Sequence, residues 1–380
     1  MHYLRTSCVL LVSVMASIAS SQQPFSKEPR LVLRDATVFI GFSPDGETIA
    51  TTATGNRGIQ LFNSTTGELR RFLGQNISGP SRSFLSPNWQ TVATLNLNER
   101  SVLKLWNVRT EHITARLRHE RAGVFLKAFF SPDSKTVATA SLDDLSVRLW
   151  DSETGESKGT LIHPKPYEYA NGVGGVAFTA DGKTLVTSSS EKLYLWELTT
   201  GQIRNTLTDE LVVFWEGFKP RKGFSHNDTI YELIISPDGK MLATGSRDGT
   251  AKIWDATKEE LRVTLKGHKR GVHRLAFSPD GRILATGSND KTAKLWDTGT
   301  GRLIASLQHR GTVWSIAFSP DGSLVATASD NEKKANVWDA KTGRLVAELA
   351  GGRPPVAFSP DGRTLATASR DKTVLLWDVP

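Results

Sequence analysis

The chain of 380 residues contains a single cysteine, Cys8, close to its N-terminus. Beyond that residue the sequence excludes a disulfide, a thiol nucleophile and a thiolate metal site. It also lacks H-E-x-x-H, G-x-S-x-G and any histidine–cysteine cluster with metal spacing. Gly182-Lys183-Thr184 is similar to the end of a phosphate loop, but Ala177 stands where the first glycine is required. We therefore expect no enzyme, no metal and no cofactor.

Long hydrophobic runs are also missing, with one exception at the N-terminus. Arg5 precedes an apolar run from Val9 to Ile18, and Ala19 and two serines follow it. This layout predicts a signal peptide over residues 1–20 and a short linker over 21–28. The run is too short to cross a bilayer as a stable helix, so we expect no transmembrane segment beyond the signal peptide. The expected location is secreted or periplasmic; the alternative is cytoplasmic, if the leader is misread.

Neither sign of charge is in large excess, because 47 Lys and Arg stand against 39 Asp and Glu, a formal net charge of +8. A moderate positive charge indicates weak attraction to acidic surfaces and says little about fold. What the chain has in quantity is turn residues, 32 Gly and 16 Pro, which is typical of an all-β protein with many turns.

One stretch, residues 275–297, has close copies on both sides of it. Its first turn, Ser278-Pro279-Asp280-Gly281, has the residues that a type I turn prefers. Short runs rich in β-branched and apolar residues flank this turn and the two that follow. The predicted strands are Val272–Phe277, Ile283–Gly287, Thr292–Trp296 and Arg302–Leu307. Four such strands form one antiparallel meander.

The unit recurs eight times along the chain. The turns begin 40 to 57 residues apart, at Ser43, Ser86, Ser131, Thr179, Ser236, Ser278, Ser319 and Ser359. Each copy closes on an aromatic residue followed by an acidic residue or asparagine, at Phe62, Trp106, Trp150, Trp196, Trp254, Trp296, Trp338 and Trp377. A period near 40–45 residues with four strands per unit is the signature of a radial repeat.

With these motifs the chain resembles the WD-repeat β-propellers over residues 29–380. The resemblance implies an all-β fold, a single monomeric propeller of eight four-stranded blades. Seven blades is the alternative, with the unit at Phe84–Trp106 as the irregular one. The last unit stops at Asp378-Val379-Pro380, directly after its third strand. We therefore expect Arg30–Leu33 to complete that blade, which removes two open edges. The F-S-P-D-G style is similar to that of bacterial members.

The resemblance also implies a role for the histidines that precede several units. In the family such a histidine bonds an aspartate of the turn between second and third strands, in a network with a strand Ser or Thr and the Trp. Two blades match it, with the residues His226, Ser246, Asp248 and Trp254, and His268, Ser288, Asp290 and Trp296. A buried, fully satisfied polar network is the simpler interpretation; a catalytic or metal role is the alternative.

The family's top face holds the connectors before each unit and the turns between second and third strands. Long loops on a rigid scaffold are common binding sites. The long connector Thr208–Thr229 mixes aromatic and basic residues, and charges elsewhere on this face are mostly basic, with fewer free acids such as Asp228 and Glu332. A solvated face of turns is the simpler interpretation. The candidate partner-binding residues are Trp215, Phe218, Lys219, Arg221, Lys222, Lys269, Arg270, Arg310 and Trp314.

These observations predict a non-catalytic scaffold that binds a protein or peptide through its top face. The basic face also allows a binder of an acidic polymer or polysaccharide, which would be sensitive to salt. A propeller enzyme needs carboxylates and histidines converging at the axis, which the repeats do not supply. Nucleic acid fits poorly, because the basic residues are scattered between units and no nucleic-acid module is present.

Overall fold

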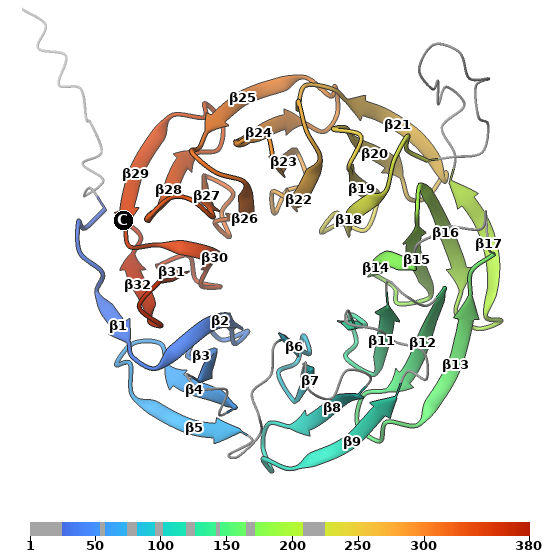
Figure 1. Cartoon of the computed structure of the whole chain (residues 1–380), viewed down its shortest axis with the longest axis horizontal. Coiled ribbons are helices and arrows are strands. Elements are labelled where there is room, and N and C mark those ends of the chain that lie inside the picture. The colour runs from blue at the N-terminus through green and yellow to red at the C-terminus, as the bar shows by residue number, and fades with distance from the viewer. Residues whose placement is uncertain are drawn as a thin grey trace, which may run out of the picture.

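The computed structural model forms a closed ring of eight antiparallel sheets around a central channel (Figure 1). It describes residues 25–53, 58–73, 82–95, 102–118, 126–141, 145–164, 172–207 and 225–380. The predicted signal peptide lies outside these ranges, as do Trp215, Phe218, Lys219, Arg221 and Lys222 of the long connector.

Each of blades one to four is a meander whose first strand lies next to the channel and whose fourth lies at the rim (Figure 1). Their strands are β2 (Ala36–Phe42), β3 (Thr48–Ala53), β4 (Ile59–Asn63) and β5 (Leu69–Leu73); β6 (Arg82–Leu85), β7 (Thr91–Leu95), β8 (Val102–Asn107) and β9 (Ile113–Arg118); β10 (Leu126–Phe130), β11 (Thr136–Ser141), β12 (Ser146–Asp151) and β13 (Ser157–Ile162); and β14 (Val173–Phe178), β15 (Thr184–Ser189), β16 (Lys192–Glu197) and β17 (Gln202–Leu207).

Blades five to seven repeat this order, and blade eight takes its rim strand from the start of the chain. Their strands are β18 (Ile230–Ile235), β19 (Met241–Ser246), β20 (Ala251–Asp255) and β21 (Glu260–Leu265); β22 (Val272–Phe277), β23 (Ile283–Ser288), β24 (Thr292–Asp297) and β25 (Leu303–Gln308); β26 (Val313–Phe318), β27 (Leu324–Ser329), β28 (Lys334–Asp339) and β29 (Leu345–Ala350); and β30 (Arg353–Phe358), β31 (Thr364–Ala368), β32 (Val374–Asp378) and β1 (Leu31–Leu33). The prediction of eight blades is confirmed, and the seven-blade alternative is wrong.

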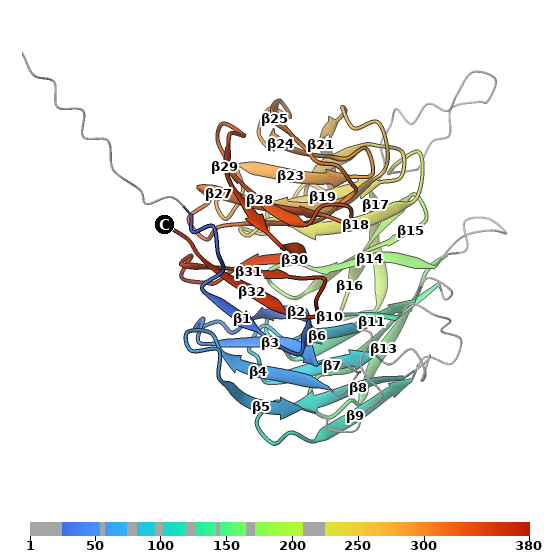
Figure 2. The same ribbon diagram turned by 60° about the vertical axis from the view of Figure 1, so that its left-hand side comes forward.

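The hydrophobic core lies between blades, because each sheet is covered on both faces by its neighbours (Figure 2). Between blades six and seven, Leu295 and Leu307 pack with Val313, Val325 and Trp338. The second strands are buried along almost their whole length and consist of small residues, as in the MLATGS sequence of β19. A unit that is apolar on both faces cannot be stable alone, so the ring is the smallest stable assembly.

The strand pair β1 and β32 closes the ring, as the sequence predicts. Leu31 lies opposite Leu376, and Leu33 lies opposite Val374. Arg30 extends the closure beyond the strand: its Nε lies 2.7 Å from a carboxylate oxygen of Asp378, and its guanidinium also donates to main-chain carbonyls of the turn after β4. This strand pair leaves blade eight with the same four strands as the others.

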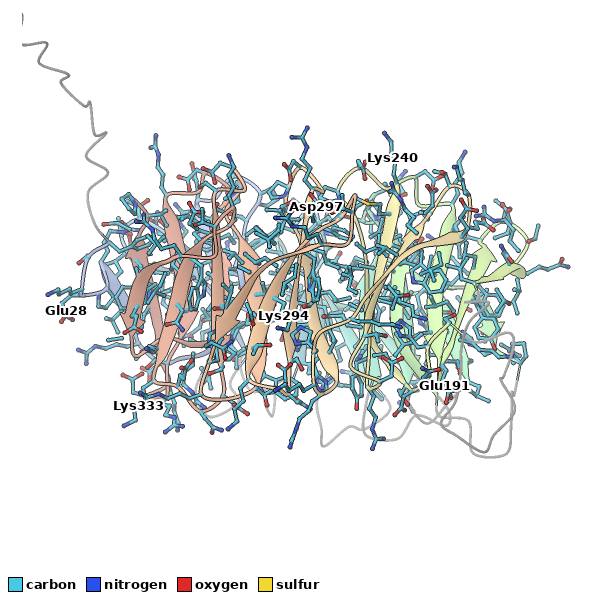
Figure 3. The ribbon with its side chains drawn as sticks, turned by 90° about the horizontal axis from the view of Figure 1, so that it is seen from above. Glu28, Glu191, Lys240, Lys294, Asp297 and Lys333 are labelled. Atoms are coloured by element: carbon cyan, nitrogen blue, oxygen red, sulfur yellow. The ribbon has the colours of Figure 1, made fainter. Side chains whose placement is uncertain are left out.

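The Ser-Pro-Asp-Gly turns join the first and second strands on one face of the ring. In blade six, Gly281 N donates to Ser278 O at 2.8 Å, and the Ser278 hydroxyl donates to Asp280 at 2.6 Å. Gly281 has φ +70°, which favours glycine. Figure 3 shows this face by Lys240 and Asp297, opposite the face that carries Glu191 and Lys333. The second face is the top face defined by the sequence.

Candidate functional site

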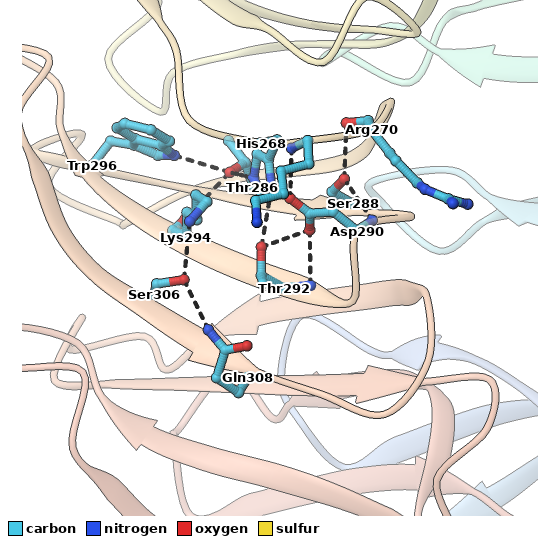
Figure 4. A network of polar contacts seen from close by, with 11 residues as sticks. His268, Arg270, Thr286, Ser288, Asp290, Thr292, Lys294, Trp296, Ser306 and Gln308 are labelled. Atoms are coloured by element: carbon cyan, nitrogen blue, oxygen red, sulfur yellow. Dashed lines mark hydrogen bonds and ion pairs between the residues drawn. The ribbon is translucent and has the colours of Figure 1, made fainter.

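A polar network under the top face joins the connector before blade six to the turn between β23 and β24 (Figure 4). His268 Nδ1 lies 2.9 Å from a carboxylate oxygen of Asp290, and His268 Nε2 lies 2.7 Å from the Thr286 hydroxyl. The indole N–H of Trp296 donates to the same hydroxyl at 2.9 Å. All four side chains come from one blade and its connector, and the His268 side chain is 2% exposed.

The carboxylate fixes the direction of each hydrogen bond in this chain. An ionised carboxylate only accepts, so neutral His268 carries its proton on Nδ1 and accepts at Nε2. The Thr286 hydroxyl then donates to His268 and accepts from Trp296. Every donor and acceptor along the chain is satisfied, which is the condition for a buried polar network to be stable.

The hydroxyl that links histidine to tryptophan is that of Thr286, and the sequence analysis assigned Ser288 instead. The Ser288 hydroxyl donates to Arg270 O at 3.0 Å and accepts from Asp290 N at 3.1 Å, so it holds the connector against the turn. Thr286 and Ser288 are two residues apart on β23, so their side chains lie on the same face of the sheet. A threonine two positions before this serine recurs in other units, and that recurrence was the signal missed.

Blade five repeats the geometry of blade six. His226 Nδ1 lies 3.1 Å from Asp248, and His226 Nε2 lies 2.7 Å from the Thr244 hydroxyl. Trp254 donates to that hydroxyl at 3.0 Å. The Ser246 hydroxyl donates to Asp228 O at 3.0 Å, the place that Ser288 takes in blade six. Both matched blades thus bring their histidine, aspartate and tryptophan together through a threonine.

Blade seven uses a glutamate where blades five and six use an aspartate. His309 Nδ1 lies 2.7 Å from Glu332, and the Thr327 hydroxyl donates to His309 Nε2 at 3.0 Å. Glu332 is 5% exposed, so its description as a free acid of the top face is wrong. The turn of blade seven places its acid one residue farther from the strand, and the longer glutamate side chain still reaches the histidine.

Blades four and eight have shorter versions. In blade four, His163 bonds the Thr187 hydroxyl at 2.6 Å, and its other nitrogen lies 3.0 Å from a main-chain carbonyl in place of a carboxylate. In blade eight, Trp377 donates to the Thr367 hydroxyl at 3.0 Å with no histidine beside it. The tryptophan–threonine bond is therefore the constant part, and the histidine and acid are additions.

Hydrogen bonding keeps the acids of these networks ionised. Burial alone would raise the pKa of Asp290, but hydrogen bonds from His268 and Thr292 hold it well below its usual 3.8. Burial would likewise raise the pKa of Glu332, and the His309 contact holds it below 4.5. Burial lowers the pKa of His309 below 6.5 although Glu332 opposes this. The His309–Glu332 pair is thus a neutral imidazole that donates to a carboxylate.

The networks also position the main chain of candidate binding residues. Lys269 N donates to Asp290 at 2.9 Å, and Arg310 N donates to Glu332 at 3.1 Å. Arg270 is held through its carbonyl by Ser288. The side chains of Lys269, Arg270 and Arg310 are exposed. Among the residues that the structure describes, no carboxylate forms an ion pair with any of these three cations.

Trp314, a candidate partner-binding residue, lies in the innermost strand of blade seven and is 38% exposed. The register between β26 and β27 shifts at Trp314, so Trp314 has no paired residue on β27. Tyr231 and His273 lie at the same kind of shift in blades five and six. A bulge re-aims the skipped side chain. The three rings form a staircase across adjacent blades, with centroids 4.3 Å apart for Tyr231 and His273 and 5.2 Å apart for His273 and Trp314.

The staircase is anchored by polar contacts at its Trp314 end. The Trp314 indole donates to Asp330 at 3.2 Å. The Arg274 guanidinium donates from Nε to Trp314 O at 2.7 Å and lies 6.0 Å from the ring centroid. Within the described ranges, no group of three or more His, Cys, Asp or Glu side chains is arranged to hold a metal ion. The same residues include no helix with the length and hydrophobicity that a bilayer crossing needs.

A family model described as "WD domain, G-beta repeat" matches residues 114–151, 218–255, 259–297, 301–339 and 356–378. All five matches end on the aspartate that follows the blade's tryptophan. The chain is an eight-bladed β-propeller with WD40 repeats. Members of the WD40 family are typically non-catalytic scaffolds that bind other proteins.

Curated relatives share the repeats over part of their length. The chain is 27% identical to Periodic tryptophan protein 2 of Arabidopsis thaliana over 214 residues, 48% of this chain and 23% of the relative. It is 28% identical to a guanine nucleotide-binding protein subunit beta of the same plant, over 56% of this chain and 54% of the relative. It is 38% identical to Nuclear distribution protein PAC1 of Arthroderma otae, over 44% and 34%.

The chain thus spans between about a quarter and about half of the length of these WD40 relatives. All three come from eukaryotes, so they lend no support to the bacterial source that the F-S-P-D-G style suggested. They give the WD40 repeat as the shared feature.

Proposed function

We propose that the top face of this WD40 propeller binds a protein or peptide partner, with Lys269, Arg270, Arg310 and Trp314 at the contact. The observation that supports the proposal is the internal use of the acids on this face. Asp248, Asp290 and Glu332 are held by histidines, and Lys269, Arg270 and Arg310 are exposed beside the last two. Such a surface favours an acidic partner through charge complementarity.

Trp314 favours a protein over a simple polyanion. It offers an exposed aromatic surface beside the Arg274 cation, and aromatic and arginine residues dominate the binding energy of protein interfaces. A hollow of about 520 Å³ adds relief to the same face; Arg310, Lys333, Lys334 and Glu348 line it, and Lys334 pairs with Glu348. The long-connector residues Trp215, Phe218, Lys219, Arg221 and Lys222 belong to the proposed surface by sequence alone.

The rest of the proposal concerns location and source. The leader over residues 1–20 supports export, and the repeat style supports a bacterial source; both rest on sequence. Export would place the partner among secreted or periplasmic proteins. Mass spectrometry tests export. A secreted chain that lacks the leader would support export, and a cytoplasmic chain with an intact N-terminus would refute it.

A capture experiment at low and high salt tests the binding proposal. Wild type is compared with Trp314→Ala, with Arg270→Ala/Arg310→Ala, and with Lys240→Ala, which removes an exposed cation from the opposite face. A protein retained at high salt by wild type and Lys240→Ala, but lost from Trp314→Ala, supports the proposal. Capture of every acidic species until the salt is raised would instead support an acidic polymer, because exposed charges are screened by salt.

A further inference from the structure

A second possible site lies inside the ring, away from the top-face cations. The inner strands β6, β10, β14, β18 and β22 line a hollow of about 540 Å³ on one side of the channel. Volumes of this size are typical of small-molecule sites, which combine an apolar lining with a few convergent polar groups.

The polar groups of this hollow come from one level of the ring. The level is defined by strand register. In each blade it is the first-strand residue that lies opposite one residue of the second strand, the one directly after the network threonine. Arg82, Lys127, Glu232 and Arg274 occupy it in blades two, three, five and six. Blade four has Gly175 at this level, so no side chain crosses the space between Lys127 and Glu232. The level thus carries three cations and one carboxylate around an open space.

Described protein groups use only part of the donor capacity of Lys127 and Arg274. Both oxygens of Glu232 are engaged, one 3.3 Å from Arg274 Nη1 and the other accepting from Leu275 N at 2.7 Å. Among the residues that the structure describes, the Lys127 ammonium donates once, to Gly174 O at 2.7 Å, and it carries three hydrogens. Arg274 Nη2 makes no hydrogen bond to any residue that the structure describes.

The charges of this level perturb one another. Burial lowers the pKa of the Lys127 ammonium, and the nearby Arg82 and Arg274 lower it further, against Glu232. Burial raises the pKa of Glu232, against the attraction of Arg274 and Lys127. An additional negative charge between Lys127 and Arg274 would relieve the repulsion among the cations.

The next level facing the hollow is apolar. Phe84 and Phe129 stand there in blades two and three, where blades six and seven have the alanines Ala276 and Ala317 at the same register. Phe84 and Phe129 line the hollow and are only partly buried. A cationic level therefore lies beside an aromatic one on the same side of the channel.

We propose that this part of the channel binds a small organic monocarboxylate with an apolar body. The carboxylate lies between Lys127 and Arg274, and the apolar body packs against Phe84 and Phe129. Glu232 already neutralises one side of Arg274, so a single negative charge fits better than a polyphosphate, which Glu232 would repel. The site shares Arg274 with the proposed top-face contact, where Arg274 lies beside Trp314, whereas Lys127 belongs to the channel site alone.

Isothermal titration calorimetry tests the site with two probes, 3-phenylpropionate and decanoate. Each is compared with an uncharged counterpart, 3-phenylpropionamide and decanol. We expect one carboxylate to bind at a single saturable site and its neutral counterpart to bind at least about tenfold more weakly, since charge-assisted hydrogen bonds are the strong ones. A preference for 3-phenylpropionate indicates that the site takes a ligand with a flat apolar body. A preference for decanoate indicates that it takes a ligand with a flexible one.

Two substitutions locate the binding. Lys127→Gln and Arg274→Gln should each weaken the preferred carboxylate by about tenfold or more, whereas Lys240→Gln on the bottom face should not. Circular dichroism of each variant checks folding, and the neutral counterparts on wild type decide the question if either variant fails to fold. The proposal is overturned if neither carboxylate binds, if neutral counterparts bind equally well, or if both folded variants bind as wild type does.

Discussion

Replacement of Thr286 by valine removes the hydroxyl at the centre of the blade-six network and keeps the shape of the side chain. The indole N–H of Trp296 and Nε2 of His268 both lose their partner, and the two side chains are 3% and 2% exposed. A buried polar group left unsatisfied costs about 1–3 kcal/mol, so two of them should lower the free energy of unfolding by about 2–4 kcal/mol after partial relaxation.

Thr264→Val is the matched control. Thr264 is a half-buried strand residue of the preceding blade, and its hydroxyl makes no hydrogen bond to a described residue. This change should alter stability by less than about 0.5 kcal/mol. The urea midpoint of each variant and the hydrogen exchange of the β23 and β24 amides measure the effect globally and locally.

The comparison also tests whether the network contributes net stability. If Thr286→Val and Thr264→Val shift the midpoint equally, the network contributes no net stability and the reasoning is refuted. If only the β23 and β24 amides exchange faster, the loss is confined to one blade, as expected for a repeat whose stability is a sum over units and interfaces.

Three further predictions concern a turn, a histidine and the ring closure. Gly343 and Gly182 both have positive φ. A Cβ at Gly343 would lie 2.2 Å from the Cβ of Ala305 in the preceding blade, whereas one at Gly182 would contact nothing within 4 Å. Gly343→Ala should therefore lower the melting temperature at least twice as much as Gly182→Ala. Burial lowers the pKa of His309, so its imidazole binds a proton more readily in the unfolded chain, and the free energy of unfolding should decrease as the pH falls from about 7 to 5. In urea titrations at both pH values, His309→Asn should flatten this dependence. An unchanged pH dependence in the variant would contradict the role given to His309. Arg30→Ala should speed hydrogen exchange of the β1 and β32 amides by up to about fivefold, since exposed ion pairs contribute at most about 1 kcal/mol. Protection that stays at the wild-type level would show that the strand pair closes the ring without the ion pair.

The repeats carried most of the fold information. The strands predicted around residues 272–307 match β22 to β25 to within one residue at each end, because turn and strand residues recur in every unit and each copy supports the others. The closure by residues 31–33 was also predictable, since the last unit lacks a fourth strand in the sequence. Eight blades follow directly from eight copies.

The site was less predictable, for reasons that are local. Ser288 and Thr286 are both hydroxyl residues on one strand, and only the register and side-chain reach show which one bonds the histidine. Glu332 looks like a surface charge in sequence because its turn differs by one residue from the other units. The staircase of Tyr231, His273 and Trp314 depends on bulges that no composition rule indicates.

The closing strand has a consequence for how the ring comes apart. β1 belongs to blade eight but continues directly into β2 of blade one, so main chain crosses that blade boundary too. Opening the ring there therefore requires β1 to separate from β32, a pairing of only three residues, together with loss of the core between blades one and eight. Loss of order would then spread from blades one and eight around both sides, and amide protection should rise toward blades four and five.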